Sequence, residues 1–133
     1  MNRLPDYHIT KMYAMYMGYS EDTLNQIKKS HKKKLFESKR HYEMRLETSI
    51  KCSVILLFVQ GDINMNRKIS AGIAENINKL CRETGYDAVD LVNHSAKNGY
   101  QHNQVVNACF SFILGGYKLS KYLKDANLRI RTR

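Results

Sequence analysis

Helical spacing of apolar residues is the feature that most constrains the fold of this sequence. Between Ile69 and Thr84, apolar side chains return every three or four residues, which places them on one face of a helix. Similar spacing recurs in the segments 6–18, 20–42, 87–98 and 101–124. We therefore expect an all-α fold, a compact bundle of about five to six helices including one long basic helix. A chain of 133 residues is the size of one domain, so the bundle should span residues 1–133.

The stretch from Ser20 to Gln60 leaves its division into helices open. A narrow buried stripe at helical spacing is predicted for Leu24, Ile27, His31, Leu35, Ser38 and Tyr42. From Thr48 to Gln60 the pattern changes to nearly continuous apolarity, and no Gly or Pro separates the two parts. One long helix and two helices meeting near residues 48–50 both fit. A central strand over residues 54–59 is a weaker alternative, since no second strand is evident to pair with it.

Several residues predict where helices begin and end. Ser20 and Asp87 are suited to cap helix N-termini, and Gly85 is suited to end a helix. Residues 61–66 (GDINMN) have the composition of a turn. The pair Gly115–Gly116 is expected to kink or end the last helix, and the basic end of the chain, 127–133, to form a flexible tail.

Charge narrows the range of partners. The chain has 22 Lys and Arg against 12 Asp and Glu, a formal net charge of +10, which attracts polyanions. Nucleic acid, an anionic membrane face and an acidic protein are the candidate partners. No apolar run approaches the roughly 20 residues that span a bilayer. The odd set Cys52, Cys81 and Cys109, without a CxxC pair, indicates free buried thiols and a cytoplasmic location.

A run of cations between Lys28 and Arg45 is the most specific functional feature. Its members are Lys28, Lys29, Lys32, Lys33, Lys34, Lys39, Arg40 and Arg45, opposed only by Glu37 and Glu43. On one helix these residues would form a band about 25 Å long. If roughly five to eight of them contacted phosphates, log K would fall with log salt at a slope of about −4 to −7. The alternative is a solvated helix face, although like charges four residues apart are unfavourable there.

Two further segments are candidates for contacts with nucleic acid. A second basic cluster near the end of the chain comprises Lys118, Lys121, Lys124, Arg129, Arg131 and Arg133. The segment 80–95 has the spacing of a helix-turn-helix, with Cys81 and Leu91 buried and Gly85 in the turn. Base or backbone contacts there would come from Asn93, His94 and Lys97. Carboxylates at the start of its second helix would repel phosphate, so an ordinary helix hairpin is the favoured interpretation.

The sequence contains no pattern that specifies catalysis. The five histidines have no HxxxH or HExxH spacing, and no Gly-rich loop is placed to hold a phosphate. His31 is expected to be partly buried and hydrogen-bonded rather than a metal ligand. We therefore expect no catalytic residues, no metal site and no cofactor.

These features favour a small basic nucleic-acid-binding protein, an accessory or regulatory factor, for example in transcription, that acts by binding. DNA is favoured over RNA as its ligand. The alternative is a protein-interaction module, an adaptor or inhibitor that docks its basic face on an acidic protein. The apolar run at residues 50–59 and the Tyr- and Met-rich N-terminus favour a homodimer.

Overall fold

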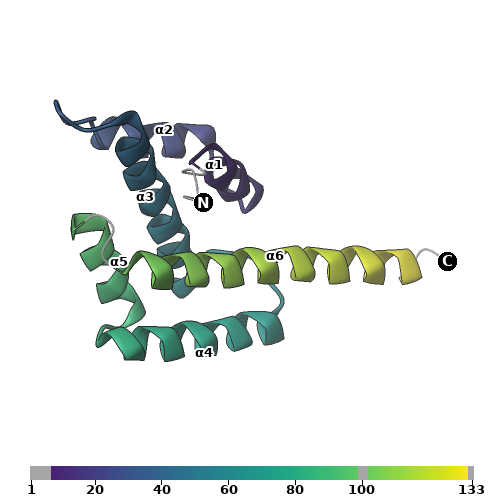
Figure 1. Cartoon of the computed structure of the whole chain (residues 1–133). Helices are drawn as coiled ribbons and strands as arrows, with labels where there is room; N and C mark the ends of the chain where they lie inside the picture. The colour runs from purple at the N-terminus through teal and green to yellow at the C-terminus, as the bar shows by residue number, and fades with distance from the viewer. Residues whose placement is uncertain (1–6, 99–101, 132–133) are drawn as a thin grey trace, which may run out of the picture.

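Six helices make up the structure, a computed structural model that describes the backbone over residues 7–98 and 102–131 (Figure 1). Side chains are described over the same ranges except 96–98 and 127–131. The helices are α1 (Tyr7–Tyr16), α2 (Glu21–Ser30), α3 (Lys39–Val59), α4 (Arg67–Thr84), α5 (Ala88–Asn98) and α6 (Asn103–Arg131). No strand occurs among the described residues. The all-α prediction is confirmed, and residues 54–59 are helical.

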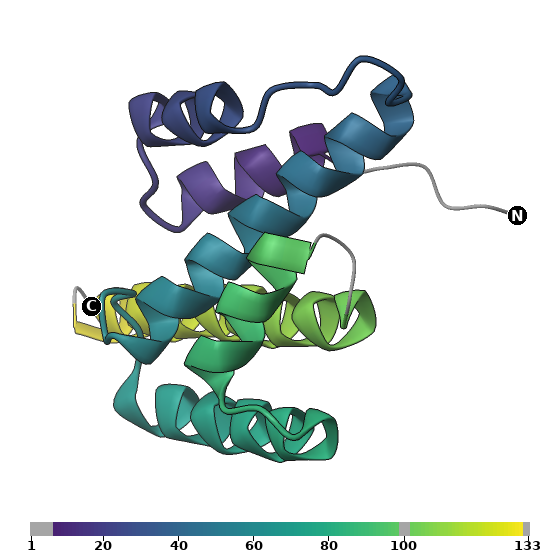
Figure 2. The ribbon, with the colours of Figure 1, turned by 90° about the vertical axis from the view of Figure 1, so that its left-hand side faces the viewer.

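The central element is α3, which packs against α1, α2, α5 and α6. Figure 2 shows α1 and α2 beside its upper part and α5 and α6 beside its lower part. Leu46, Ile50 and Val54 are almost completely buried, and burial of each such side chain contributes roughly 1.5–3 kcal/mol. Because neighbours cover α3 on several sides, its second half has no single apolar stripe. This explains the nearly continuous apolarity of residues 48–59.

The stretch 20–60 forms two helices, but they do not meet near residues 48–50. Instead α2 ends at Ser30 and α3 begins at Lys39, and the α2–α3 loop, residues 31–38, joins them. The predicted stripe is wrong at Leu35, which is 87% exposed, and at Ser38, which is also exposed, whereas Tyr42 is partly buried against the core as predicted. The single basic helix expected over residues 28–45 does not form either.

Other helix ends agree with the sequence. Ser20 Oγ accepts a hydrogen bond from the Thr23 N–H at 3.1 Å, and Asp87 Oδ1 accepts one from the Asp90 N–H at 2.8 Å. Gly85 follows α4 with a φ of 82°, the left-handed conformation that favours glycine. These contacts confirm the two N-caps and the turn between α4 and α5.

The pair Gly115–Gly116 does not interrupt α6, which continues to Arg131 as a straight ribbon in Figure 1. The expected kink or end is therefore wrong. Gly116 is buried where α6 lies beside α4, and a Cβ there would overlap Ile73 Cδ1 and lie 3.0 Å from Ile69 Cγ2. Glycine thus allows close approach of two helices. Most of the expected tail 127–133 is the end of α6, and residues 132–133 lie outside the described ones.

None of the helices over the described ranges has the length and apolarity needed to cross a membrane.

We predict that Gly116→Ala is less stable than Gly115→Ala. Both changes gain the same intrinsic helix preference of about 0.5–1 kcal/mol, and a Cβ at Gly115 meets nothing within 4 Å. Only the Ala at 116 strains the contact with α4, which costs roughly 1–3 kcal/mol. Urea unfolding of the two variants measures this difference directly. A difference below about 0.5 kcal/mol, the usual range for a surface change, would contradict close packing of α4 on α6.

Candidate nucleic-acid interface

Seven exposed cations surround the α2–α3 loop at one end of the molecule. They are Lys28, Lys29, Lys32, Lys33, Lys34, Lys39 and Arg40, and we call them the basic corner. They come from the end of α2, the loop and the start of α3, so they do not form a band along one helix. Figure 2 shows the loop running from the end of α2 across to the start of α3. The corner lies at the top of Figure 1, at the N-terminal end of α3.

Local interactions explain why the chain leaves the helical conformation here. Continuing α2 would place Lys28 and Lys29 one turn below Lys32 and Lys33, and such like-charge pairs destabilise a helix. Ser38 offers an alternative, because its Oγ accepts a hydrogen bond from the His41 N–H at 3.1 Å and caps α3. The loop and a new helix start are thereby favoured over one continuous helix.

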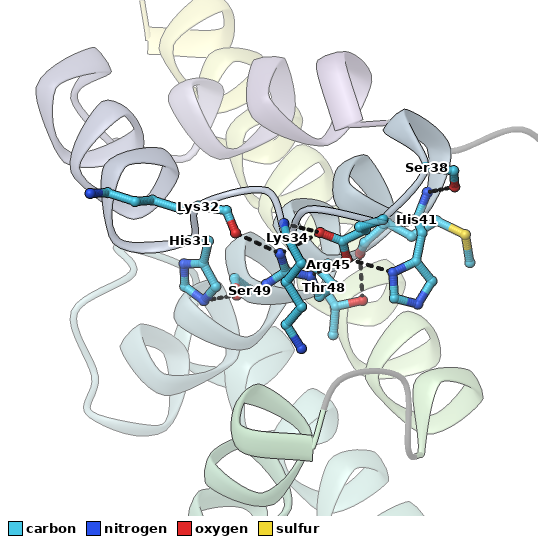
Figure 3. A network of polar contacts seen from close by, with 10 residues as sticks. His31, Lys32, Lys34, Ser38, His41, Arg45, Thr48 and Ser49 are labelled. Atoms are coloured by element: carbon cyan, nitrogen blue, oxygen red, sulfur yellow. Dashed lines mark hydrogen bonds and ion pairs between the residues drawn. The ribbon is translucent and has the colours of Figure 1, made fainter.

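A bidentate ion pair between Glu37 and Arg45 ties the loop to α3. Arg45 Nε lies 2.6 Å from Glu37 Oε2, and Arg45 Nη2 lies 2.7 Å from Glu37 Oε1. The same carboxylate accepts from the Lys34 N–H at 3.1 Å and lies 2.5 Å from His41 Nδ1. Figure 3 shows Lys34, His41 and Arg45 close together, joined through dashed contacts. The side chain of Glu37 is only 3% exposed, so the one acid of the loop is turned inward.

The ion pair with Glu37 also makes Arg45 less available for contacts with phosphate. The sequence counts Arg45 among the phosphate contacts, but its guanidinium is directed at Glu37 and donates through Nη2 to the Lys32 carbonyl at 3.0 Å. The hydrogen bonds from Arg45, followed by those from His41 and the Lys34 backbone, outweigh burial and hold the pKa of Glu37 well below its ordinary value of 4.5. Arg45 therefore organises the loop.

His31 anchors the other end of the loop. Its Nδ1 donates to the Ile27 carbonyl at 2.9 Å, and its Nε2 lies 3.0 Å from Ser49 Oγ on α3 (Figure 3). The prediction of a partly buried, hydrogen-bonded histidine is confirmed. The loop is thus fixed to α3 at both ends.

Leu35 and Phe36 lie at the tip of this loop and are 87% and 96% exposed. The helical spacing predicts a buried Leu35, which is wrong, and it makes no prediction for Phe36. The available signal was two adjacent apolar residues in a polar run, because neighbours in sequence cannot both lie on one narrow helix stripe.

The α4–α5 hairpin has the buried positions expected of a helix-turn-helix but an unsuitable surface. Cys81 and Leu91 are buried as predicted. The start of α5 exposes Asp87 and Asp90 beside the exposed Asn93, and these carboxylates repel phosphate.

The two remaining residues predicted for this hairpin are less available for base contacts. His94 is half-buried and stacks on Tyr86, with ring centroids 4.9 Å apart. The ring centroid of His102 lies 5.4 Å from that of His94. The side chain of Lys97 lies outside the described ones.

The second basic cluster lies elsewhere, on the part of α6 that extends away from the basic corner (Figures 1 and 2). Lys118 Nζ lies 4.5 Å from the ring centroid of Tyr13, and Lys121 Nζ lies 4.7 Å from that of Tyr16. These cation–π contacts help attach α1 to α6. Lys124 is exposed. The side chains of Arg129, Arg131 and Arg133 lie outside the described part.

The three cysteines are free and buried, as predicted. Burial raises the pKa of Cys52 and of Cys109 to about 12, so both thiols are protonated at neutral pH. Within the described ranges, no three His, Cys, Asp or Glu residues form a group that could hold a metal ion.

Comparisons with protein-family models, with curated proteins and with solved structures give no match for this chain. The candidate interface therefore stands on the charge, exposure and hydrogen bonding of its own residues.

We predict that the stabilisation from the Glu37 contacts declines progressively as the pH becomes acidic. Since folding lowers the pKa of Glu37, its contribution is complete above the ordinary value near 4.5 and is lost as pH falls below it. The Tm advantage of the wild type over Glu37→Gln should therefore shrink between about pH 5 and about pH 3. Other titrating groups are common to both proteins. A Tm difference that stays constant over this range would contradict a lowered pKa.

Proposed function

We propose that this protein binds nucleic acid through the basic corner and acts by binding rather than by catalysis. The observation that carries the proposal is the separation of charge around the α2–α3 loop. Seven cations are exposed there, while Glu37 is turned inward and paired with Arg45. The corner therefore offers phosphates a surface from which the loop's own carboxylate is removed.

Such a surface recognises the phosphate backbone more than a base sequence. Lysine ammonium groups on flexible stems act as point charges and release counterions from nucleic acid when they contact its phosphates. The α4–α5 hairpin adds no suitable base-reading surface, since Asp87 and Asp90 are exposed at its second helix. Binding through the corner should thus be strongly salt-dependent and only weakly dependent on sequence.

A second candidate function is docking on an acidic protein. It is favoured by apolar side chains exposed away from the basic corner, among them Met12 on α1 and Tyr122 on α6. Large exposed apolar side chains commonly anchor protein interfaces. A partner of this kind would depend on these anchors more than on the lysines of the loop. The homodimer stays a prediction, but most of the apolar run at residues 50–59 on which it partly rests is buried within the protein.

We predict that reversing three loop charges flattens the salt dependence of binding. The wild type should bind a labelled duplex with a log K against log salt slope of about −4 to −6, as expected for roughly five to seven phosphate contacts. Lys32→Glu, Lys33→Glu and Lys34→Glu together should flatten it by about 2–3 and weaken binding. Fluorescence anisotropy across a salt series measures both effects.

The matched control reverses three exposed cations on α4, Arg67, Lys68 and Lys79. Each triple variant lowers the net charge by six, from +10 to +4. Only the loop variant should show a flatter slope of log K against log salt. Equal losses in both variants would mean that net charge alone drives binding. Absence of binding by the wild type at low salt would contradict the proposal and favour the acidic-protein partner.

A further inference from the structure

The most exposed large apolar side chains among the described residues lie on the α2–α3 loop, between the cations of the basic corner. Phe36 and Leu35 are 96% and 87% exposed, whereas Phe58 and Phe110 are buried in the core. Lys33 and Lys34 precede the apolar pair, and Lys39 and Arg40 follow it closely. Folding gains nothing from this placement, because apolar side chains stabilise a protein when they are removed from water.

The backbone holds this pair outward in a tight turn. The Glu37 N–H donates to the Lys34 carbonyl at 3.1 Å, so Leu35 and Phe36 occupy the two central positions of a four-residue turn. Glu37 Oε1 accepts from the Lys34 N–H at 3.1 Å and closes the turn a second time. Since Glu37 is itself fixed by Arg45, the turn is preorganised before any ligand arrives.

A ligand for this tip must combine dense negative charge with flat apolar faces. Nucleic acid with unpaired bases has both, because its phosphates can reach the lysines while a base stacks on the aromatic ring. In an intact duplex the bases already stack on one another, and inserting a side chain costs unstacking energy. An anionic membrane is the less favoured ligand. Two side chains bury little apolar surface, and even a whole myristoyl chain gives only marginal, reversible membrane binding.

Resting on the proposed function, we infer that Phe36, with Leu35 beside it, stacks on an unpaired base. Single strands, or duplexes with unpaired bases, are therefore the preferred ligands of the basic corner. The lysines supply the salt-dependent part of binding. The stacked ring supplies a part of the binding free energy that salt does not screen.

The chain contains no tryptophan, so Phe36→Trp introduces a unique fluorophore at the tip. Titration with a single strand should quench its emission strongly and titration with a matched duplex should quench it less. Phosphatidylserine vesicles should not shift the emission to the blue. Phe112→Trp, at a partly exposed position on α6, is the matched control and should not respond.

Affinity measurements with Phe36→Ala complete the test. Binding to the single strand should weaken by roughly 5- to 140-fold, the range of one base–aromatic stack. The salt slope should stay that of the wild type, because no phosphate contact is removed. Circular dichroism should be unchanged, since Phe36 is 96% exposed.

The outcomes separate the two proposals. Wild-type affinity in Phe36→Ala together with a wild-type salt slope would overturn the stacking inference and leave nucleic-acid binding intact. No binding by either protein would overturn the proposed function itself. A blue shift with vesicles and no quenching by nucleic acid would overturn stacking in favour of an anionic membrane surface.

Discussion

The bidentate ion pair between Glu37 and Arg45 is the interaction on which the basic corner depends. Seven exposed cations repel one another. This repulsion favours conformations of the loop in which its lysines lie farther apart. Glu37 opposes this from beneath the loop, where it accepts hydrogen bonds from Arg45 and the Lys34 backbone and contacts His41. Charge-assisted bonds of this kind offset the cost of removing a carboxylate from water. The contacts of Glu37 therefore hold the loop in one conformation, although repulsion between its lysines favours many conformations.

The shape has two consequences for recognition. Because the Glu37 carboxylate faces inward, the exposed charged side chains of the loop are all lysines, which attract polyanions over a distance that salt shortens. The turn closed by Glu37 and Lys34 exposes Leu35 and Phe36 among these cations. In the function that we propose, electrostatic attraction brings a polyanion to the loop, and the apolar tip selects polyanions that have unpaired bases. One eight-residue loop thus combines both properties without help from the α4–α5 hairpin.

Much of the fold could be predicted from the sequence, because its signals are local. The spacing from Ile69 to Ile77 and the caps at Ser20 and Asp87 depend on residues within a few positions of one another. The α2–α3 loop was missed because spacing alone cannot distinguish a buried stripe from a chance match such as Leu35. Contacts between distant segments have no local signal in the sequence. Examples are the contact of Gly116 with Ile73 and the burial of Lys51 between Glu47 and Asn107. For the candidate site, the sequence identified the exposed cations of the loop, but not the inward pairing of Arg45 or the exposed tip.

Binding of nucleic acid by Glu37→Gln tests most directly whether the ion pair organises the corner. The substitution keeps the size of the side chain and raises the net charge by one from +10, and it releases Arg45 to face a phosphate. If charge alone mattered, the variant would bind more tightly. We predict weaker binding at constant salt, with helical content unchanged, because the loop loses the ionic one of its two anchors to α3. Binding equal to or tighter than that of the wild type would contradict it.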